Sequence, residues 1–408
     1  MQLRIVWRNL TAKPLQSLVT AAIVALAVAL TVTLLLLAEG MHQGLVRATE
    51  PFDLIVGAKG SPIQLVLNTV FLQDKPIGNI DRQLLAELAA RPDVTSAIPL
   101  GFGDNYRGYR IVGTSGAIFE QRVAGDRPPW LGLAAGRAFA APFEAVVGAK
   151  AAQELGIKVG DRFKSIHGLS AAEQGETHAH PYRVVGILQP VGGPYDQAIL
   201  VAMESIWEIH EHHDATAQGP AEVEAEDHDE HEHGVTAILV KPKGYADAMR
   251  LYQQFQTEQR AQLVFPAQVI VQFFAIMGQG EQILQLIAAL VIGITLLTVA
   301  LTLYGVAHSR GREQAVLRAI GAQAGDIFRI ILLEGALTVG AGLVIGLLAG
   351  HGLFNLLAGF LQQQTAVTIG LAGSLNELAL AGCVMGFGLL ASLIPAAGAY
   401  RFDVARNL

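Results

Sequence analysis

Eight of the 12 histidines in this chain of 408 residues fall between residues 178 and 233, where they are mixed with acidic side chains. They are His178, His180, His210, His212, His213, His228, His231 and His233. Imidazole and carboxylate groups bind zinc, nickel and copper, and a flexible tract can gather several of them around one ion. The last six therefore are candidate ligands for zinc or another divalent transition metal, in a His- and acid-rich loop at about residues 205–234.

Two alternatives to a specific metal site remain open. The tract is too acidic and polar to form a packed core, so it could equally be a disordered loop with incidental metal affinity. His178 and His180 precede a predicted strand near Arg183, where a structural role is the alternative. The single cysteine, Cys383, lies inside a long apolar run, which excludes a cysteine metal cluster and an intrachain disulfide.

Other catalytic chemistry finds no support in the sequence. We find no G-x-x-x-x-G-K-[ST] loop, no nucleophile elbow and no zincin motif. The apolar runs carry almost no charge, and one acid, Glu334, is too few for a proton-driven carrier. The chain is therefore predicted not to be an enzyme, and any energy for transport would have to come from another chain.

The composition predicts a membrane protein, because 52% of the residues are hydrophobic and only 15% are charged. Crossing a bilayer takes about 20 apolar residues. Four segments qualify: 14–38, 282–306, 330–350 and 378–397. The first is longer than the apolar core of a signal peptide, about 7–15 residues, so we expect an uncleaved anchor.

Charge predicts the orientation of these spans. Residues 39–281 carry a net charge of −11, whereas the rest of the chain carries +4. Basic residues gather in residues 1–13, 307–329 and 398–408, and residues 351–377 contain none. The positive-inside rule places those three segments in the cytoplasm, with residues 39–281 and the loop 351–377 outside. Residues 1–13 also have the pattern of an amphipathic helix at the inner membrane surface.

The middle segment reads as an α+β domain. A strand–helix–strand pattern at residues 53–99 is repeated at residues 236–265, and the two copies bracket an insertion at about 118–234. We therefore predict an α-helical four-span bundle with a two-lobed extracytoplasmic α+β domain between spans one and two. Stalk helices at about 39–49 and 267–281 would join the domain to the spans.

Three glycines in the third span, Gly342, Gly346 and Gly350, form a repeated small face. In lipid such faces let helices approach closely. We expect this one to serve packing within the bundle or across a dimer.

The segment 307–329 is basic and helix-forming, and its residue pattern has known counterparts. Arg312-Glu313, Leu317-Arg318 and Gly321, followed by Ile327-Phe-Arg329 and Leu332-Leu-Glu334-Gly335, resemble the coupling segment of MacB/FtsX-type ABC transporter permeases. Ile394-Pro395-Ala396 resembles the closing motif of that family. Val146-Val-Gly148 and Val184-Val-Gly186 resemble phrases of its extracytoplasmic domain. The layout of one span, a large domain and three spans is similar over nearly the whole chain.

The resemblance implies the permease subunit of an ABC transporter in the bacterial inner membrane, with a periplasmic domain and both termini cytoplasmic. It implies a homodimer or paired permease bound to a separate cytoplasmic ABC ATPase. ATP would bind only to that partner subunit. Arg312, Glu313, Leu317, Arg318 and Gly321 would form the ATPase-coupling site. Without the resemblance, the same segment is a solvated basic loop.

Partners outside the membrane would be a periplasmic binding protein, a lipoprotein or an adaptor, and no nucleic acid is expected. Two alternatives to transport stay open. The first is mechanotransmission, in which the chain activates a periplasmic partner and nothing crosses the membrane. The second is a metal-binding membrane protein that needs no ATPase.

Overall fold

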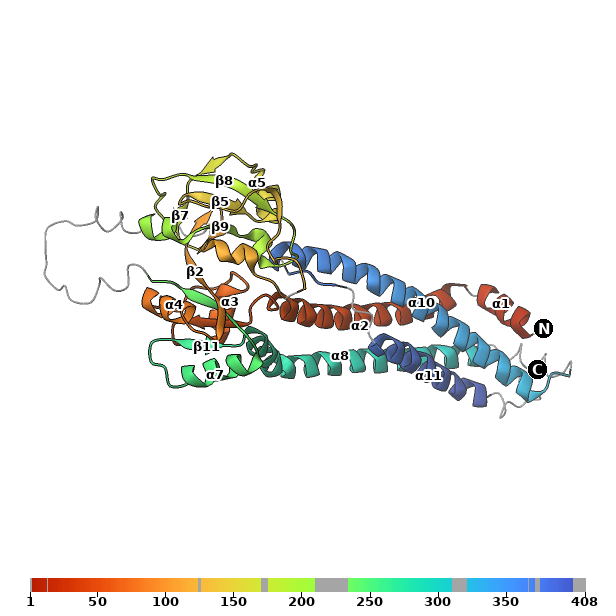
Figure 1. Ribbon diagram of the computed structural model, residues 1–408. Helices are drawn as coiled ribbons and strands as arrows, with labels where there is room; N and C mark the ends of the chain where they lie inside the picture. The colour runs from red at the N-terminus through yellow and green to blue at the C-terminus, as the bar shows by residue number, and fades with distance from the viewer. Residues whose placement is uncertain are drawn as a thin grey trace. The chain divides into compact units, whose positions relative to one another are not determined.

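The computed structural model describes residues 2–12, 14–123, 126–169, 175–209, 234–309, 321–365, 367–370 and 375–398. The chain divides into two compact units. The helical unit comprises residues 1–41, 277–360 and 369–408, and the domain unit comprises residues 42–276 and 361–368. Helices α2, α8 and α10 contribute residues to both units (Figure 1).

The helices have these bounds: α1 Gln2–Ala12, α2 Pro14–Ala48, α3 Pro62–Thr69, α4 Arg82–Ala89, α5 Ala149–Leu155, α7 Tyr245–Phe255, α8 Pro266–Ser309, α10 Ala324–Thr365 and α11 Leu375–Gly398. Residues 203–209 are also helical, and short 3-10 helices lie at Gly116–Glu120 (η1) and Pro194–Gln197 (η2). The predicted stalks exist as helix: α2 runs on to Ala48, and α8 begins at Pro266, a residue suited to the first position of a helix.

Among the described residues of the helical unit, two helical segments are long and apolar enough to cross a membrane, Ser17–Ala48 and Ala324–Gln362. Shorter apolar helices cover Ala289–Thr302 and Glu377–Leu393, so all four predicted spans are helical while their number as spans stays a prediction. The four helices pack around a small apolar void of ≈ 10 Å³. Its lining is Val24, Ala27, Val28, Ile292, Thr295, Val339 and Val384.

One boundary prediction is wrong. The predicted loop at residues 351–377 is helical as far as Thr365, because α10 continues without interruption. This stretch has no proline, and it keeps placing apolar side chains on one face, with Phe354 and Ala358 buried. The lack of Lys and Arg in residues 351–377 was used to place this segment outside the membrane, and a helix there does not test that orientation.

The domain unit is built on one mixed sheet of 11 strands in the order β11-β1-β10-β2-β3-β9-β5-β8-β4, with β6 paired to β8 and β7 to β2. The strands are β1 Leu54–Gly57, β2 Val94–Tyr106, β3 Tyr109–Thr114, β4 Leu133–Gly136, β5 Glu144–Val147, β6 Arg162–Phe163, β7 Ile166–His167, β8 Tyr182–Leu188, β9 Ile199–Ala202, β10 Ala237–Pro242 and β11 Gln262–Val264.

Successive residues of a strand point to opposite faces of the sheet, and each face is covered by a cluster of buried apolar side chains. Leu54 and Val56 of β1 belong to one apolar cluster and Ile55 to the other. The same alternation holds in β5, β9 and β10. Helices α4, α5 and α7 cover the first cluster, whereas α3 and the start of α8 cover the second.

The strands of the predicted insertion, residues 118–234, do not form a separate sheet. They continue the sheet beyond β3, where β9 pairs with β3 in parallel. The 13-residue strand β2 contributes to both parts, since it pairs with β10 at one end and with β3 and β7 at the other. The domain unit therefore has one continuous sheet, and its division into two lobes stays a prediction.

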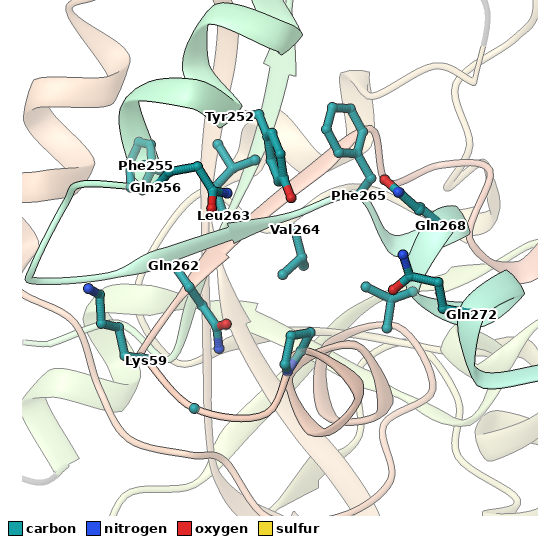
Figure 2. Close-up of a pocket in the computed structure, with 13 residues that line it drawn as sticks. Lys59, Tyr252, Phe255, Gln256, Gln262, Leu263, Val264, Phe265, Gln268 and Gln272 are labelled. Atoms are coloured by element: carbon teal, nitrogen blue, oxygen red, sulfur yellow. The ribbon is translucent and has the colours of Figure 1, made fainter. Parts of the chain in front are cut away.

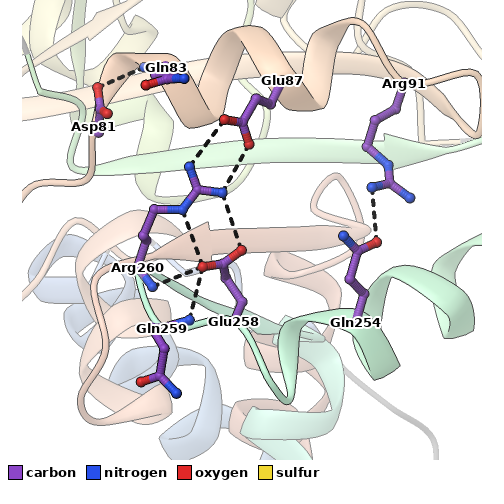
Figure 3. Close-up of polar contacts among 8 residues, drawn as sticks. All are labelled: Asp81, Gln83, Glu87, Arg91, Gln254, Glu258, Gln259 and Arg260. Atoms are coloured by element: carbon purple, nitrogen blue, oxygen red, sulfur yellow. Dashed lines mark hydrogen bonds and ion pairs between the residues drawn. The ribbon is translucent and has the colours of Figure 1, made fainter.

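A surface ion-pair group joins the two halves of the bracketing fold. The guanidinium of Arg260, just before β11, donates to Glu87 of α4 at 3.0 and 3.1 Å and to Glu258 at 3.2 and 3.3 Å (Figure 3). These bonds lower the pKa of Glu258 to about 2. Exposed ion pairs contribute little stability, so the group fixes geometry more than it adds free energy.

Candidate functional site

The ends of three long helices meet inside the domain unit. His42 near the end of α2 and Phe274 near the start of α8 have ring centroids 4.7 Å apart. At Gly44 an added Cβ would lie 2.9 Å from the carbonyl oxygen of Thr368, in the segment that follows α10. Val367 of that segment is buried in one of the two core clusters. Movement of any one of these helix ends must therefore displace packed domain residues.

The segment after α10 is also hydrogen-bonded to a loop between β8 and β9. The backbone N–H and Oγ1 of Thr368 both donate to the carbonyl oxygen of Gly192, at 3.2 and 2.7 Å. Lys150, at the start of α5, donates to the carbonyl oxygen of Gln362 at 3.3 Å. The predicted stalks are α2 and α8, and the end of α10 is a third connection that the sequence did not reveal.

The loop that receives Thr368 is held rigid by Asp196 of η2. The carboxylate of Asp196 accepts hydrogen bonds from the N–H groups of Val191 and Gly192, both at 2.8 Å. Burial raises the pKa of Asp196, and these backbone bonds together with the charge of Lys150 oppose that rise. Next to it, the buried hydroxyl of Tyr195 donates to the carbonyl oxygen of Thr69 at 3.0 Å. The loop is thus anchored to the domain core.

In the helical unit, the glycine face of α10 lies against α2 of the same chain (Figure 1). Added Cβ atoms at Gly342 and Gly346 would lie 2.7 Å from the carbonyl oxygens of Ala21 and Ala25. Thr33 of α2 donates to the carbonyl oxygen of Gly350 at 3.1 Å. Of the two uses predicted for this face, packing within the bundle is the one these contacts form.

The predicted coupling residues are only partly described. Arg312, Glu313, Leu317 and Arg318 lie outside the described residues, whereas Gly321 adopts a left-handed φ of 106° just before α10. The helix start is stabilised by Asp326, whose carboxylate accepts the N–H of Gln323 at 3.2 Å, as in a capping box.

The first turn of α10 and the end of α11 pack together. Ile327 and Ile331 bury their side chains against Ala396. Ile327 belongs to the segment Ile327-Phe-Arg329 that follows the coupling residues, and Ala396 belongs to the closing motif. Two segments far apart in the sequence thus form one small apolar contact.

The candidate metal ligands of the tract, His210, His212, His213, His228, His231 and His233, all lie outside the described residues. His178 is described and is buried beside Asp104, with His167 close by. Sequence reasoning missed Asp104 and His167, because neither lies in the histidine-rich tract and only the fold brings them to His178.

The domain also carries an open cavity of ≈ 400 Å³ between α7, β11 and the start of α8. Figure 2 shows the amide side chains of Gln262, Gln268 and Gln272 around it, with Tyr252 and Val264 between them. Amide groups both donate and accept hydrogen bonds, so this lining suits a neutral polar group such as a peptide bond.

Comparison with known proteins identifies the family. Residues 17–258 match the family model of the MacB-like periplasmic core domain, and residues 286–403 match that of the FtsX-like permease C-terminal region. The "Uncharacterized ABC transporter permease YvrN" of Bacillus subtilis (strain 168) is 24% identical over 226 residues, which are 53% of this chain and 53% of that protein. The match thus spans about half the length of that relative.

Two solved structures are also similar. One is the extracellular domain of the noncanonic ABC-type transporter YknZ from Gram-positive bacteria, with 12% identity, a TM-score of 0.30, and coverage of 52% of this chain and 98% of that one. The other is the periplasmic region of MacB from Actinobacillus actinomycetemcomitans, with 12% identity, a TM-score of 0.34, and coverage of 56% and 95%. Neither score is high enough to establish a common fold.

Within the described residues, two helices that are long and apolar enough to cross a membrane are joined to an α+β domain. Because the first family model covers more than half of its residues, the chain belongs to the MacB/FtsX family of ABC transporter permeases.

Proposed function

We propose that the chain is the non-catalytic permease subunit of an ATP-driven system. A separate cytoplasmic ABC ATPase hydrolyses ATP and pushes on residues 312–321, and the long helices carry the movement to the periplasmic domain. The observation that supports this most is that α2, α8 and α10 are continuous helices with residues in both units. In this proposal the protein lies in the bacterial inner membrane as a homodimer, with both termini cytoplasmic.

Charge reversal in the coupling segment tests the proposal. We expect Glu313→Lys to abolish copurification of an ABC ATPase with the full-length chain in detergent, because a docking helix that presents the wrong charge loses its complementary partner. The thermal unfolding of the variant should match that of the parent. The matched control is Glu204→Lys, the same change on an exposed helical residue of the domain. An ATPase that stays bound to Glu313→Lys, or that never copurifies with the parent, would refute the assignment.

A second candidate, mechanotransmission without transport, has a specific observation in its favour. The described parts of α2, α8, α10 and α11 line a small void of ≈ 10 Å³, and the α2–α10 contact is tight. The surface of this void is apolar, which does not suit a polar cargo. An experiment in reconstituted vesicles that contain the chain and its ATPase distinguishes transport from signalling. It measures two responses to ATP: loss of a domain contact, such as that between Thr368 and Gly192, and movement of Zn²⁺, used as a probe, across the membrane. Loss of the contact without movement of Zn²⁺ would favour signalling.

We also propose that the tract at residues 205–234 binds zinc or another divalent transition metal in the periplasm. Replacing His210, His212, His213, His228, His231 and His233 together by serine, hereafter the tract variant, should lower the number of zinc ions bound per chain in calorimetry. The reason is that hydroxyl groups are poor substitutes for imidazole as ligands of zinc. An unchanged stoichiometry would contradict the proposal and leave incidental affinity as the interpretation.

A further inference from the structure

A second group of metal-ligand side chains lies inside the domain unit and includes no residue of the tract at 205–234. Its members are Asp104 of β2, His167 of β7 and His178. The sheet brings them together: Asp104 and His167 are direct cross-strand partners. The N–H of His178 donates to the carbonyl oxygen of Ser165 at 3.0 Å, which continues the ribbon by one more strand-like segment.

The distances between the ligand atoms fit a single small ion. Asp104 Oδ1 lies 3.1 Å from His178 Nε2 and 3.6 Å from His167 Nδ1, and all three atoms lie within 4.8 Å of one another. Zinc bound tetrahedrally at about 2.0–2.1 Å holds its ligand atoms about 3.3 Å apart. The two distances from Asp104 bracket that value, and the histidine nitrogens, which lie within 4.8 Å of each other, would have to reach it by side-chain shifts.

Burial is graded across the group in a way that suits an ion with an open position. The side chains of Asp104 and His178 are 0% and 4% exposed, whereas that of His167 is 55% exposed. An ion could therefore enter from the His167 side and keep a water there, as three-ligand zinc sites do. A carboxylate buried this deeply needs a compensating positive charge.

Two arrangements fit these three side chains: a hydrogen bond between Asp104 and His178 alone, or a divalent cation shared by all three. The hydrogen bond, with 3.1 Å between Asp104 Oδ1 and His178 Nε2, involves no third residue. The cation also explains why His167, from a different strand, turns its Nδ1 towards the same carboxylate oxygen. These alternatives differ in their dependence on zinc, which makes them separable by experiment.

The surrounding backbone holds the group in place. The side-chain amide of Asn105 donates to the carbonyl oxygen of Gly168 at 2.9 Å. The backbone N–H of Gly168 donates to the carbonyl oxygen of Gly103 at 2.8 Å. At Gly175 an added Cβ would collide with the carbonyl oxygen of His167, so the strand-like segment that leads to His178 can approach only because residue 175 has no side chain.

Two buried hydroxyl groups near the cluster lack a hydrogen-bond partner among the described residues: those of Ser165 and Tyr182. The backbone carbonyl oxygen of Ser165, not its hydroxyl, accepts the N–H of His178. Tyr182 is close enough for the charge of Asp104 to add to the rise in its pKa caused by burial. Groups placed like these around a site can orient a metal-bound water or a ligand side chain.

We infer that Asp104, His167 and His178 form a binding site for one divalent transition cation, of which zinc fits the N₂O ligand set best. The site is separate from the histidine-rich tract and does not depend on the proposed ATPase. Its ion would fasten β7 and His178 to β2.

The test uses the full-length tract variant in detergent, stripped of metal by a chelator, so that the tract does not compete. We expect calorimetry with Zn²⁺ alone to show one ion per chain, and zinc to raise the melting temperature. Adding His167→Ala should weaken binding by about 100-fold or more, because even the loss of an outer partner of a metal ligand costs about 10–100-fold. Adding His178→Gln should do the same.

His167 is half exposed, so His167→Ala should keep the melting temperature of its parent in the presence of chelator. That result shows that its loss of binding is not a loss of folding. The matched control is His180→Ala, which removes an exposed neighbouring histidine and should leave zinc binding unchanged. If the tract variant binds no zinc, or if zinc binding survives His167→Ala, the site does not exist and the hydrogen bond between Asp104 and His178 is the remaining interpretation.

Discussion

Replacing Gly346 by leucine is expected to force α10 away from α2 and to lower the free energy of unfolding of the helical unit by about 1–3 kcal/mol. The added Cβ alone would lie 2.7 Å from the carbonyl oxygen of Ala25 and 2.7 Å from the Cβ of Val28. A backbone oxygen in the middle of a helix cannot turn aside as a side chain can, so the whole helix has to shift.

The environment makes this contact hard to replace. Within a bilayer, apolar surface gives no drive for helices to associate, and the attraction comes from close packing and interhelical hydrogen bonds. The shift would remove both, because the hydrogen bond from Thr33 to Gly350 lies one turn along the same contact. Thermal unfolding of the purified chain in detergent measures the effect.

The matched control for this change lies on the same helix. Gly352→Leu adds the same side chain to α10 where no atom lies within 4 Å of an added Cβ. Its melting temperature should equal that of the parent. A graded series is also expected: Gly346→Ala should destabilise more than Gly350→Ala, since the nearest contact at Gly350 is 3.0 Å. Equal melting temperatures for the Gly346 and Gly352 variants would show that the two helices are not packed this way.

Sequence patterns predicted the elements that are determined by local chemistry. The helices α4 and α7 and the strands β1 and β10 lie within the two predicted strand–helix–strand patterns, and β8 is the strand predicted near Arg183. Each has a clear apolar period of its own. The two long helices α2 and α8 were also expected, because an apolar run of this length has few other ways to satisfy its backbone.

What depends on distant pairing was not predictable. Strand β2 was predicted to extend only to Pro99, the end of the first strand–helix–strand pattern. It continues to Tyr106 because β3 and β7 both pair with this stretch. Helix α3 was missed as well, although Ser61 and Pro62 provide a capping residue and a favourable first position.

The same difference between local patterns and distant pairing decides which site residues could be predicted from the sequence. The glycine face of α10 could be predicted, because its spacing of four residues follows from the geometry of one helix. The group of Asp104, His167 and His178 could not be, because two of its members are isolated polar residues until β2 and β7 pair. The docking of Thr368 on the loop at Gly192 was hidden for the same reason.

Replacing Gly148 by alanine is expected to disturb that docking from inside the domain. Gly148 ends β5 and lies against η2, where an added Cβ would be 2.5 Å from the carbonyl oxygens of both Tyr195 and Asp196. Its own N–H is fixed by a 2.8 Å bond to the carbonyl oxygen of Ala198, so it cannot retreat. We expect a loss of about 1–3 kcal/mol in the free energy of unfolding of the domain.

The displaced element is the one that anchors the end of α10, and this gives the variant a second effect. If η2 moves, Asp196 can no longer hold the N–H groups of Val191 and Gly192, and the hydrogen bonds from Thr368 to Gly192 are lost. Hydrogen exchange at the amide of Thr368 should therefore become faster in Gly148→Ala, by more than global destabilisation explains.

The control for this change lies in the same loop. Gly193→Ala meets no atom within 4 Å, and the φ of −141° at Gly193 suits alanine, so both stability and exchange at Thr368 should stay unchanged. If Gly148→Ala lowers stability while Thr368 keeps its protection, η2 does not transmit the disturbance. Any movement that ATP produces would then have to reach the domain through α2 and α8, since the third connection would carry none.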